Sequence, residues 1–107
     1  MINIIVKQKD NHINDVTISG HAMSAEHGKD LVCAGVSASS VGILNSLVKY
    51  GFLENKLGTL EMENGYIHIV VNKYTKDIQV ILETLITILE TIQETNQEFV
   101  EISKVEV

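Results

Sequence analysis

The sequence lacks several features, and each absence excludes a class of protein. It contains no proline and no low-complexity tract, so nothing in it looks like an interdomain linker. It contains one cysteine, Cys33, which excludes an internal disulfide. Its 8 basic residues are all lysine and are outnumbered by 14 acidic residues, for a formal charge of −6. That balance argues against nucleic acid as a partner, because phosphate binding depends on clusters of basic side chains.

Neither a secretory leader nor a membrane span is expected. Residues 1–9 carry no apolar core followed by a cleavage site. We expect no apolar run long enough for a bilayer-spanning helix, and therefore a soluble cytoplasmic protein with no membrane partner. The 107 residues suit one domain, 1–107. A core of this size is only modestly stable, so association with a second copy fits the length.

The hydrophobic pattern predicts two β-hairpins. Apolar residues alternate over 2–9 and again over 12–19, where an offset in the alternation indicates a bulge. Residues 57–63 and 66–73 form the second predicted hairpin. The dipeptide Asn64-Gly65 between them favours a type I′ turn, which needs positive φ at both positions.

Two helices and a last strand complete the predicted fold. Asp30 is a favoured helix N-cap, and apolar residues at helical spacing follow it to about Tyr50, where Gly51 ends the helix. Thr75 caps a second helix with one apolar face, and residues 98–107 form a closing strand. The order ββαββαβ predicts an α+β domain, a mainly antiparallel sheet with two helices packed on one face.

Cys33 is the first residue with reactive chemistry. If Asp30 is the cap, Cys33 is the third helical residue, where backbone N–H groups lack partners within the helix and the helix dipole is positive. Both effects favour a thiolate, and the same N–H groups can stabilise an oxyanion. A free cysteine is also commonly just a small buried residue, so both interpretations are open at this point.

The neighbours of Cys33 allow a catalytic interpretation and a structural one. His21 ends a predicted strand and can act as the base that a cysteine nucleophile needs, or it is a surface histidine. Asp30 either caps the helix or orients His21. Ser37 and Ser40 share the helix face of Cys33. Their hydroxyls either contact a substrate backbone or bond back to the preceding turn.

A metal site and a lid are further hypotheses for this segment. Zinc competes with catalysis because several ligand types are present, but the usual paired ligand spacing is missing and we expect no metal. The candidate ligands are His12, His21, His27, Asp30 and Cys33. Met23 to Lys29 is either a lid that orders over a substrate or an ordinary loop. His68 lies on a predicted strand and is expected to be structural.

The segment from Gly20 to Ser37 resembles the ribosomal-processing cysteine protease family, called Prp. The order of histidine before cysteine, the short spacing between them and the cysteine at a helix start all match that family. The resemblance covers about a fifth of the chain, and the length and element order fit the remainder. The matching residues are Gly20, His21, Ala22, Gly28, Asp30, Val32, Cys33, Ala34, Val36 and Ser37.

This resemblance implies a function that composition does not. Such proteases remove a short N-terminal extension from large-subunit ribosomal protein number twenty-seven, cutting after a pair of aromatic residues, and they are homodimers. The family's nucleophile corresponds to Cys33 and its base to His21, while Asp30 and Ser37 match further motif positions. No cofactor is implied. An acidic enzyme also suits a strongly basic ribosomal substrate.

Two other functions are compatible with the same residues. A non-catalytic ribosome-associated module would bind a ribosomal-protein tail without cutting it, and Cys33 would then be packed and inert. A thiol redox sensor would need an exposed and reactive Cys33, as the protease does. The reactivity of the thiol and the fate of a bound peptide distinguish these hypotheses.

Overall fold

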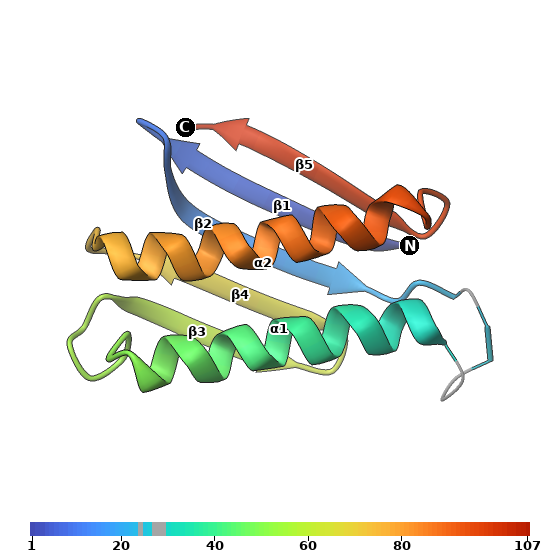
Figure 1. Cartoon of the computed structure of the whole chain (residues 1–107), viewed down its shortest axis with the longest axis horizontal. Coiled ribbons are helices and arrows are strands. Elements are labelled where there is room, and N and C mark those ends of the chain that lie inside the picture. Colours follow the sequence, from blue (N-terminus) through green and yellow to red (C-terminus); the bar gives the residue numbers. More distant parts are fainter. Residues whose placement is uncertain (24, 27–29) are drawn as a thin grey trace.

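The structure is a computed structural model that describes residues 1–23, 25–26 and 30–107. These residues form a five-stranded sheet with two long helices lying side by side over one of its faces (Figure 1). The predicted order ββαββαβ is confirmed. The elements are β1 (Ile2–Lys9), β2 (His12–Gly20), α1 (Leu31–Lys49), β3 (Gly58–Glu63), β4 (Tyr66–Val71), α2 (Lys76–Glu94) and β5 (Val100–Glu106).

The sheet is mixed but mainly antiparallel, as predicted. Its strand order is β3-β4-β2-β1-β5. The pairs β1–β2, β2–β4 and β3–β4 are antiparallel, whereas β5 runs parallel to β1. A parallel neighbour requires a long crossover, and α2 supplies it by carrying the chain from β4 across the sheet to the far edge (Figure 1).

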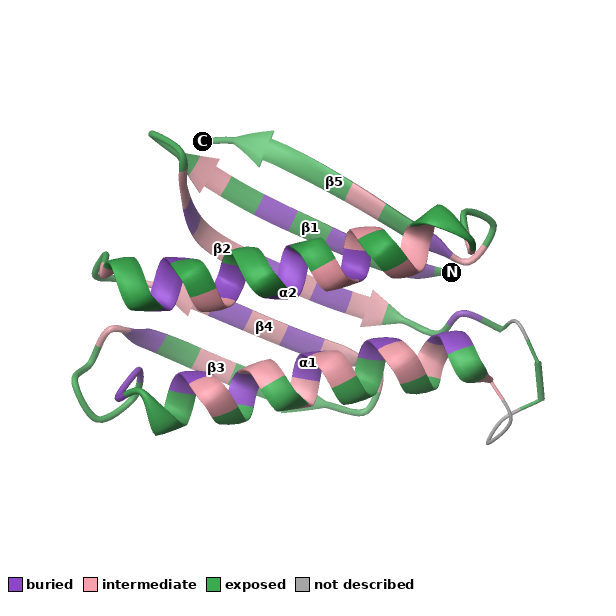
Figure 2. Ribbon diagram, in the orientation of Figure 1, coloured by how far each residue is buried: buried purple, intermediate pink, exposed green. Residues whose placement is uncertain are grey.

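The core lies between the sheet and the two helices. Figure 2 shows buried positions alternating along the inner strands and recurring on the helix faces that point toward them. On α2 the predicted apolar face is correct, because four of its members are buried and Ile81 and Ile92 are partly buried against the core. The four are Ile78, Leu82, Leu85 and Leu89.

The predicted end of α1 is confirmed. Gly51 has a φ of 84°, a conformation that favours glycine. The amides of Gly51 and Phe52 donate to the carbonyls of Val48 and Leu47 at 3.1 and 3.0 Å. This pattern is a Schellman motif, which satisfies the last carbonyls of the helix. It turns the chain back toward the sheet and buries Phe52 completely.

Of the two hairpin turns, the one between β3 and β4 differs from the prediction. Gly65 has a φ of 72°, but Asn64 is not in the positive-φ region, so the predicted type I′ turn between β3 and β4 is wrong. Positive φ at both central residues occurs instead in the β1–β2 turn, at Asp10 (53°) and Asn11 (66°). Aspartate and asparagine tolerate this conformation better than most side chains.

The predicted bulge lies in the first hairpin. Lys7 pairs with Asp15 but Gln8 pairs with Ile13, so the register shifts between Lys7 and Gln8. Gln79 of α2, which is buried, occupies this break. Its side-chain oxygen accepts from the amide of Ile13, and its side-chain nitrogen donates to the carbonyl of Ile13, both at 2.8 Å. The backbone groups are therefore satisfied, and α2 is attached to β2.

Helix α1 is long and apolar enough to cross a bilayer by length and composition, so the expectation that no such run exists was wrong. In the fold this helix packs against the sheet through Val32, Val36, Leu44 and Leu47. A core helix of a globular domain meets the same criterion of length and hydropathy. Only 28% of this apolar stretch is buried, so packing accounts for its inner face and not for the apolar residues on its exposed face.

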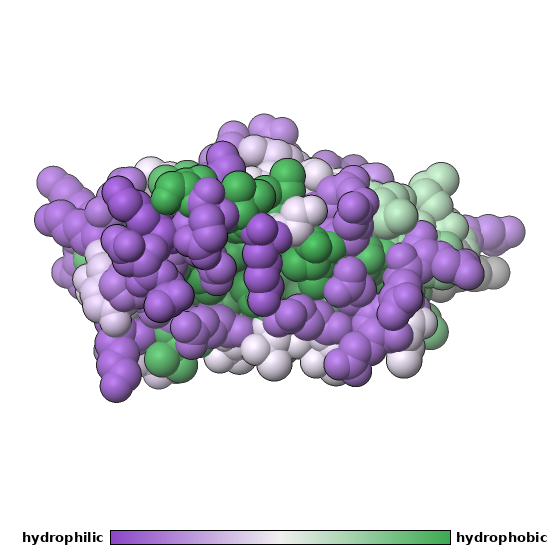
Figure 3. Space-filling model, turned by 90° about the horizontal axis from the view of Figure 1, so that it is seen from above, coloured by the Kyte–Doolittle hydropathy of each residue, from purple (hydrophilic) through white to green (hydrophobic). Residues whose placement is uncertain are grey.

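The outer edge of the sheet at β5 is polar. Figure 3 looks down on this side and shows hydrophilic residues over most of the surface, with hydrophobic residues between them. Charged and polar residues on the edge strand disfavour pairing with the strands of other molecules. The exposed polar residues of β5 are Glu101, Ser103, Lys104 and Glu106.

Candidate active site

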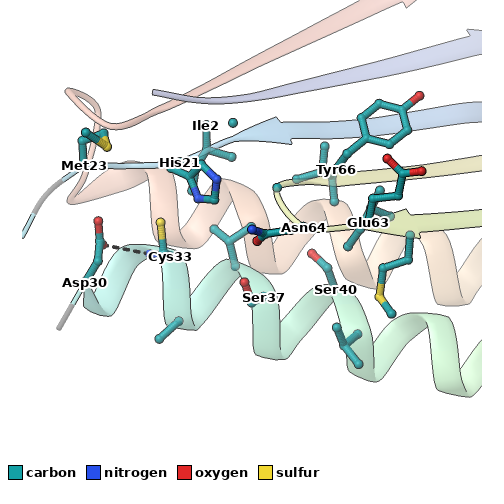
Figure 4. Close-up of a pocket in the computed structure, with 18 of the residues that line it drawn as sticks. Ile2, His21, Met23, Asp30, Cys33, Ser37, Ser40, Glu63, Asn64 and Tyr66 are labelled. Atoms are coloured by element: carbon teal, nitrogen blue, oxygen red, sulfur yellow. Dashed lines mark hydrogen bonds between the residues drawn. The ribbon is translucent and has the colours of Figure 1, made fainter. Parts of the chain in front are cut away.

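Three segments that are distant in the sequence meet at one end of the sheet. They are the end of β2, the first turns of α1, and the turn between β3 and β4. A cleft of about 800 Å³ lies between them and is large enough to hold part of a peptide. Figure 4 shows His21 and Cys33 directed into this cleft from different elements. The prediction that His21 serves as the base for Cys33 requires the two to meet in this way.

Gly20 turns the end of β2 so that His21 faces the cleft. Its φ is 92°, and a Cβ at this position would collide with the carbonyl oxygen of Met1. Only glycine therefore fits here. The amide of Gly20 also donates to the carbonyl of Gly65 at 2.9 Å, which attaches the end of β2 to the β3–β4 turn.

The His21 ring packs directly on Gly65. A Cβ added at Gly65 would lie 2.8 Å from Nε2 and 3.2 Å from Cε1 of the His21 ring. The bare backbone of the turn thus forms a platform that positions the imidazole. The sequence prediction assigned Gly65 to a turn and missed this second role, because nothing in a local pattern connects residues so far apart in the chain.

Cys33 lies in the first turn of α1 and is half-buried. Its Sγ accepts a hydrogen bond from the amide of Ala22 at 3.1 Å. Ala22 directly follows His21 and is buried, so one short segment brings both the imidazole and a backbone donor to the sulfur. Among the described residues no hydrogen bond joins His21 to Cys33. Catalytic hydrogen bonds are often loose until a substrate binds.

Asp30 caps α1, which confirms one of its two predicted roles. Its Oδ1 accepts from the amide of Cys33 at 3.0 Å, and its carbonyl accepts from the amide of Ala34, also at 3.0 Å. The amides of Cys33 and Ala34 thus both have hydrogen-bond partners. The expectation that the amides around Cys33 are free was wrong for these two. The amide of Ala22 is the donor at the sulfur instead. The other suggested role of Asp30, orienting His21, stays a prediction.

The two predicted serines line the cleft at different depths. Ser37 is exposed and lies one turn after Cys33 on α1. Ser40 is only 1% exposed, and its Oγ makes no hydrogen bond within the described residues. The alternative in which Ser40 bonds back to the preceding turn is therefore wrong. Its hydroxyl points from α1 toward the β3–β4 turn (Figure 4).

The candidate zinc ligands are not brought together in the part of the chain that the structure describes. His12 lies at the opposite end of β2 from His21 and stacks on Tyr74, with ring centroids 4.0 Å apart. No three histidine, cysteine, aspartate or glutamate side chains in the described part are grouped as metal ligands. His27 lies outside the described residues.

The other predictions for this region have mixed outcomes. Of the proposed lid, residues 24 and 27–29 lie outside the described residues, while Met23 and Glu26 are exposed and line the cleft. His68 hydrogen-bonds to Asp15 on the neighbouring strand β2, with 2.9 Å between Nε2 and Oδ2. That bond across two strands agrees with a structural role.

Known proteins match this chain over nearly its whole length. The family model described as cysteine protease Prp matches residues 1–101. Two proteins named ribosomal processing cysteine protease Prp, from Staphylococcus aureus and Bacillus subtilis, are each 34% identical to it, over 97 and 94 residues. These alignments cover 88% and 83% of this chain and 90% and 83% of the relatives. The chain belongs to the Prp family.

Solved structures agree with this assignment. A crystal structure of the essential ribosomal processing protease Prp from S. aureus, with a covalently linked product peptide, superposes with a TM-score of 0.85 and 28% identity. The match covers 97% of this chain and 99% of that one. A Streptococcus mutans protein has a TM-score of 0.80 and 27% identity, over 100% and 96% of the two chains. The predicted α+β fold and cysteine protease class are confirmed.

A cysteine protease acts through a thiol that attacks the peptide carbonyl and forms a covalent intermediate. In this chain Cys33 is the single cysteine, and it lies in the cleft that also receives His21. The cleft is therefore the candidate active site.

Proposed function

We propose that this Prp protein removes the N-terminal extension of large-subunit ribosomal protein number twenty-seven, cutting after a pair of aromatic residues. Cys33 is the nucleophile and His21 is the base. The observation that carries this proposal is the junction of β2 and α1. There the segment bearing His21 also donates the Ala22 amide to Cys33 Sγ.

The proposed reaction needs only these two side chains. His21 takes the thiol proton, and the thiolate attacks the scissile carbonyl carbon to form a C–S bond. The tetrahedral intermediate collapses and breaks the C–N bond, while His21 returns the proton to the leaving amine. Water, deprotonated by His21, then attacks the thioester carbonyl carbon. The C–S bond breaks, the acid is released, and His21 returns the proton to the sulfur. The Ala22 amide and the positive end of α1 stabilise negative charge at the sulfur.

The charge of the cleft supports a basic substrate. Glu26, Asp30 and Glu63 line it, and no lysine lies among the described lining residues. The whole chain carries a formal charge of −6. A cationic peptide tail is therefore drawn to the site, mainly through a faster encounter. A second S. aureus Prp structure, solved with a substrate peptide, supports peptide binding by the same fold (TM-score 0.79).

The interior of the cleft supports aromatic residues beside the cut. Its deeper lining includes Ile2, Ile18, Val36 and Ile67, all of which are buried apolar side chains. Such a lining favours large apolar rings, which bury more area than other side chains. A basic tail that lacks aromatic residues would leave this apolar lining unfilled, so the lining favours the proposed substrate over other basic tails.

A homodimer in the cytoplasm is part of the same proposal and follows from the family resemblance. Sedimentation equilibrium of the purified protein tests the assembly directly. We expect a mass twice that of one chain, and a monomeric mass at all concentrations would contradict it.

Mass spectrometry of a peptide that copies the extension tests the proposed activity. We expect one cut, after the aromatic pair. Cys33→Ala should slow it by at least ~10³-fold, and His21→Ala by roughly 10²–10⁴-fold. His12→Ala is the matched control, because His12 lies at the far end of β2, and it should cut normally. A Cys33→Ala variant that cuts at a comparable rate would refute the nucleophile, and an intact peptide would favour a binding module.

A further inference from the structure

Ser40 is the unusual polar residue of this fold. Only two polar side chains of the described chain are buried, Ser40 and Gln79. Gln79 makes hydrogen bonds through both ends of its amide, whereas the Ser40 hydroxyl has no partner. A buried hydroxyl without a partner destabilises a protein, and native structures contain few of them. An unpaired hydroxyl in a cleft is therefore a candidate for binding a ligand.

The position of Ser40 relates it to the proposed nucleophile. It lies seven residues after Cys33 on α1, which places it roughly 10 Å farther along the helix axis. An extended peptide advances ~3.3 Å per residue. A peptide that lies along α1 with its scissile bond at Cys33 would thus bring the residue about three positions from that bond next to Ser40.

We propose that Ser40 is a specificity residue that hydrogen-bonds to a neutral polar side chain of the substrate, about three residues from the bond that is cut. This inference rests on the proposed function. Ser40 is 1% exposed and its hydroxyl is closed to water, so a substrate side chain reaches it only by displacing the cleft side chains that cover it. A main chain at the surface cannot do this. Its apolar neighbours in the cleft, such as Val36 and Val41, would disfavour a charged group.

The hydroxyl can both donate and accept, so an amide or hydroxyl side chain satisfies it. An apolar side chain of the same length would leave the buried oxygen unpaired. Sites of this kind discriminate strongly against analogues that lack the polar group. We expect a preference of roughly tenfold for glutamine over methionine at the position that reaches Ser40.

Peptide binding to the Cys33→Ala variant, measured by fluorescence anisotropy, tests this inference without any cleavage step. Glutamine and methionine, which have similar lengths, are exchanged in turn at each position of the extension peptide. We expect glutamine to be preferred at one position, about three residues from the aromatic-pair cut. The preference should vanish when Ser40→Ala is added and persist with Ser39→Ala, which lies outside the cleft lining.

Stability separates a role in specificity from a structural one. Ser40→Ala removes a hydroxyl that has no partner, so the Tm should stay the same or rise. A lower Tm together with equal weakening of every peptide would overturn the proposal. So would a glutamine preference that survives Ser40→Ala, or no preference at any position. Failure of the proposed function is distinguishable, because it appears as an uncut peptide with the unaltered protein.

Discussion

Helices α1 and α2 lie on the same face of the sheet and each has 19 residues, yet they differ in composition and in what they do. α2 contains five charged residues and one apolar face, and its buried face packs on the sheet. α1 contains one charged residue, Lys49, and consists largely of alanine, glycine, serine and valine. Small side chains leave room beside α1 for the cleft, whereas the large ones of α2 fill the core.

The same contrast holds for the buried polar side chain of each helix. Gln79 of α2 satisfies both backbone groups of Ile13 and so belongs to the fold. Ser40 of α1 has no partner and lines the cleft. Stability is therefore concentrated on α2 and the proposed chemistry on α1. Four predictions test this division.

The largest change in stability should come from Gln79→Met. It removes both hydrogen bonds at similar side-chain length and leaves the amide and carbonyl of Ile13 buried without partners. Two such groups should lower the free energy of unfolding by roughly 2–4 kcal/mol. Urea denaturation measures this loss, and kcat/KM of the folded enzyme should change little. A large loss of kcat/KM with normal stability would break the division between the helices.

Gly65→Ala should reduce activity by roughly tenfold. The new Cβ would press on the His21 ring from 2.8 Å, and the positive φ adds strain of about 1–2 kcal/mol. Gly51→Ala is the matched control, because Gly51 also has positive φ but faces Asn55 instead of His21. We expect both variants to lose stability and only Gly65→Ala to lose kcat in peptide cleavage. Equal kcat values would show that His21 does not depend on the turn.

Removing either helix cap should lower stability by a smaller amount, and only one of the two removals should change the reactivity of Cys33. Asp30→Ala and Thr75→Ala each remove a side-chain bond to an amide of the first turn, at a cost of about 1 kcal/mol. Only Asp30→Ala frees the amide of Cys33, so only that variant should change the rate of thiol alkylation. Asp30→Asn keeps a capping oxygen and should preserve stability. An equal change in alkylation with Thr75→Ala would contradict this assignment.

The smallest expected effect is a gain from Gly42→Ala. Nothing lies within 4 Å of a Cβ built at this position of α1, and alanine is the better helix former. Thermal unfolding should show a stabilisation of about 0.5–1 kcal/mol. Cleavage should be unaffected, since Gly42 does not line the cleft. A lower Tm would indicate that the outer face of α1 is covered, for example by a second copy.

Local features of the fold were predictable because they depend on neighbouring residues. The caps Asp30 and Thr75, the end of α1 at Gly51 and the bulge in the first hairpin all depend on short-range chemistry, and all are confirmed. The type I′ turn at Asn64-Gly65 was not, because other two-residue turns also accept this dipeptide. The family motif also identified His21 and Cys33 before any contact between their segments was known.

By itself the sequence determined the elements, their order, the caps and the pair of residues proposed for catalysis, since each follows from periodicity, local chemistry or a short motif. Only the tertiary structure decided how they meet. The parallel pairing of β5 with β1, the His21 ring on Gly65, the Ala22 amide at Cys33 and the unpaired hydroxyl of Ser40 are of this kind. Such contacts depend on how the two helices pack across the whole sheet, and no local pattern contains that information.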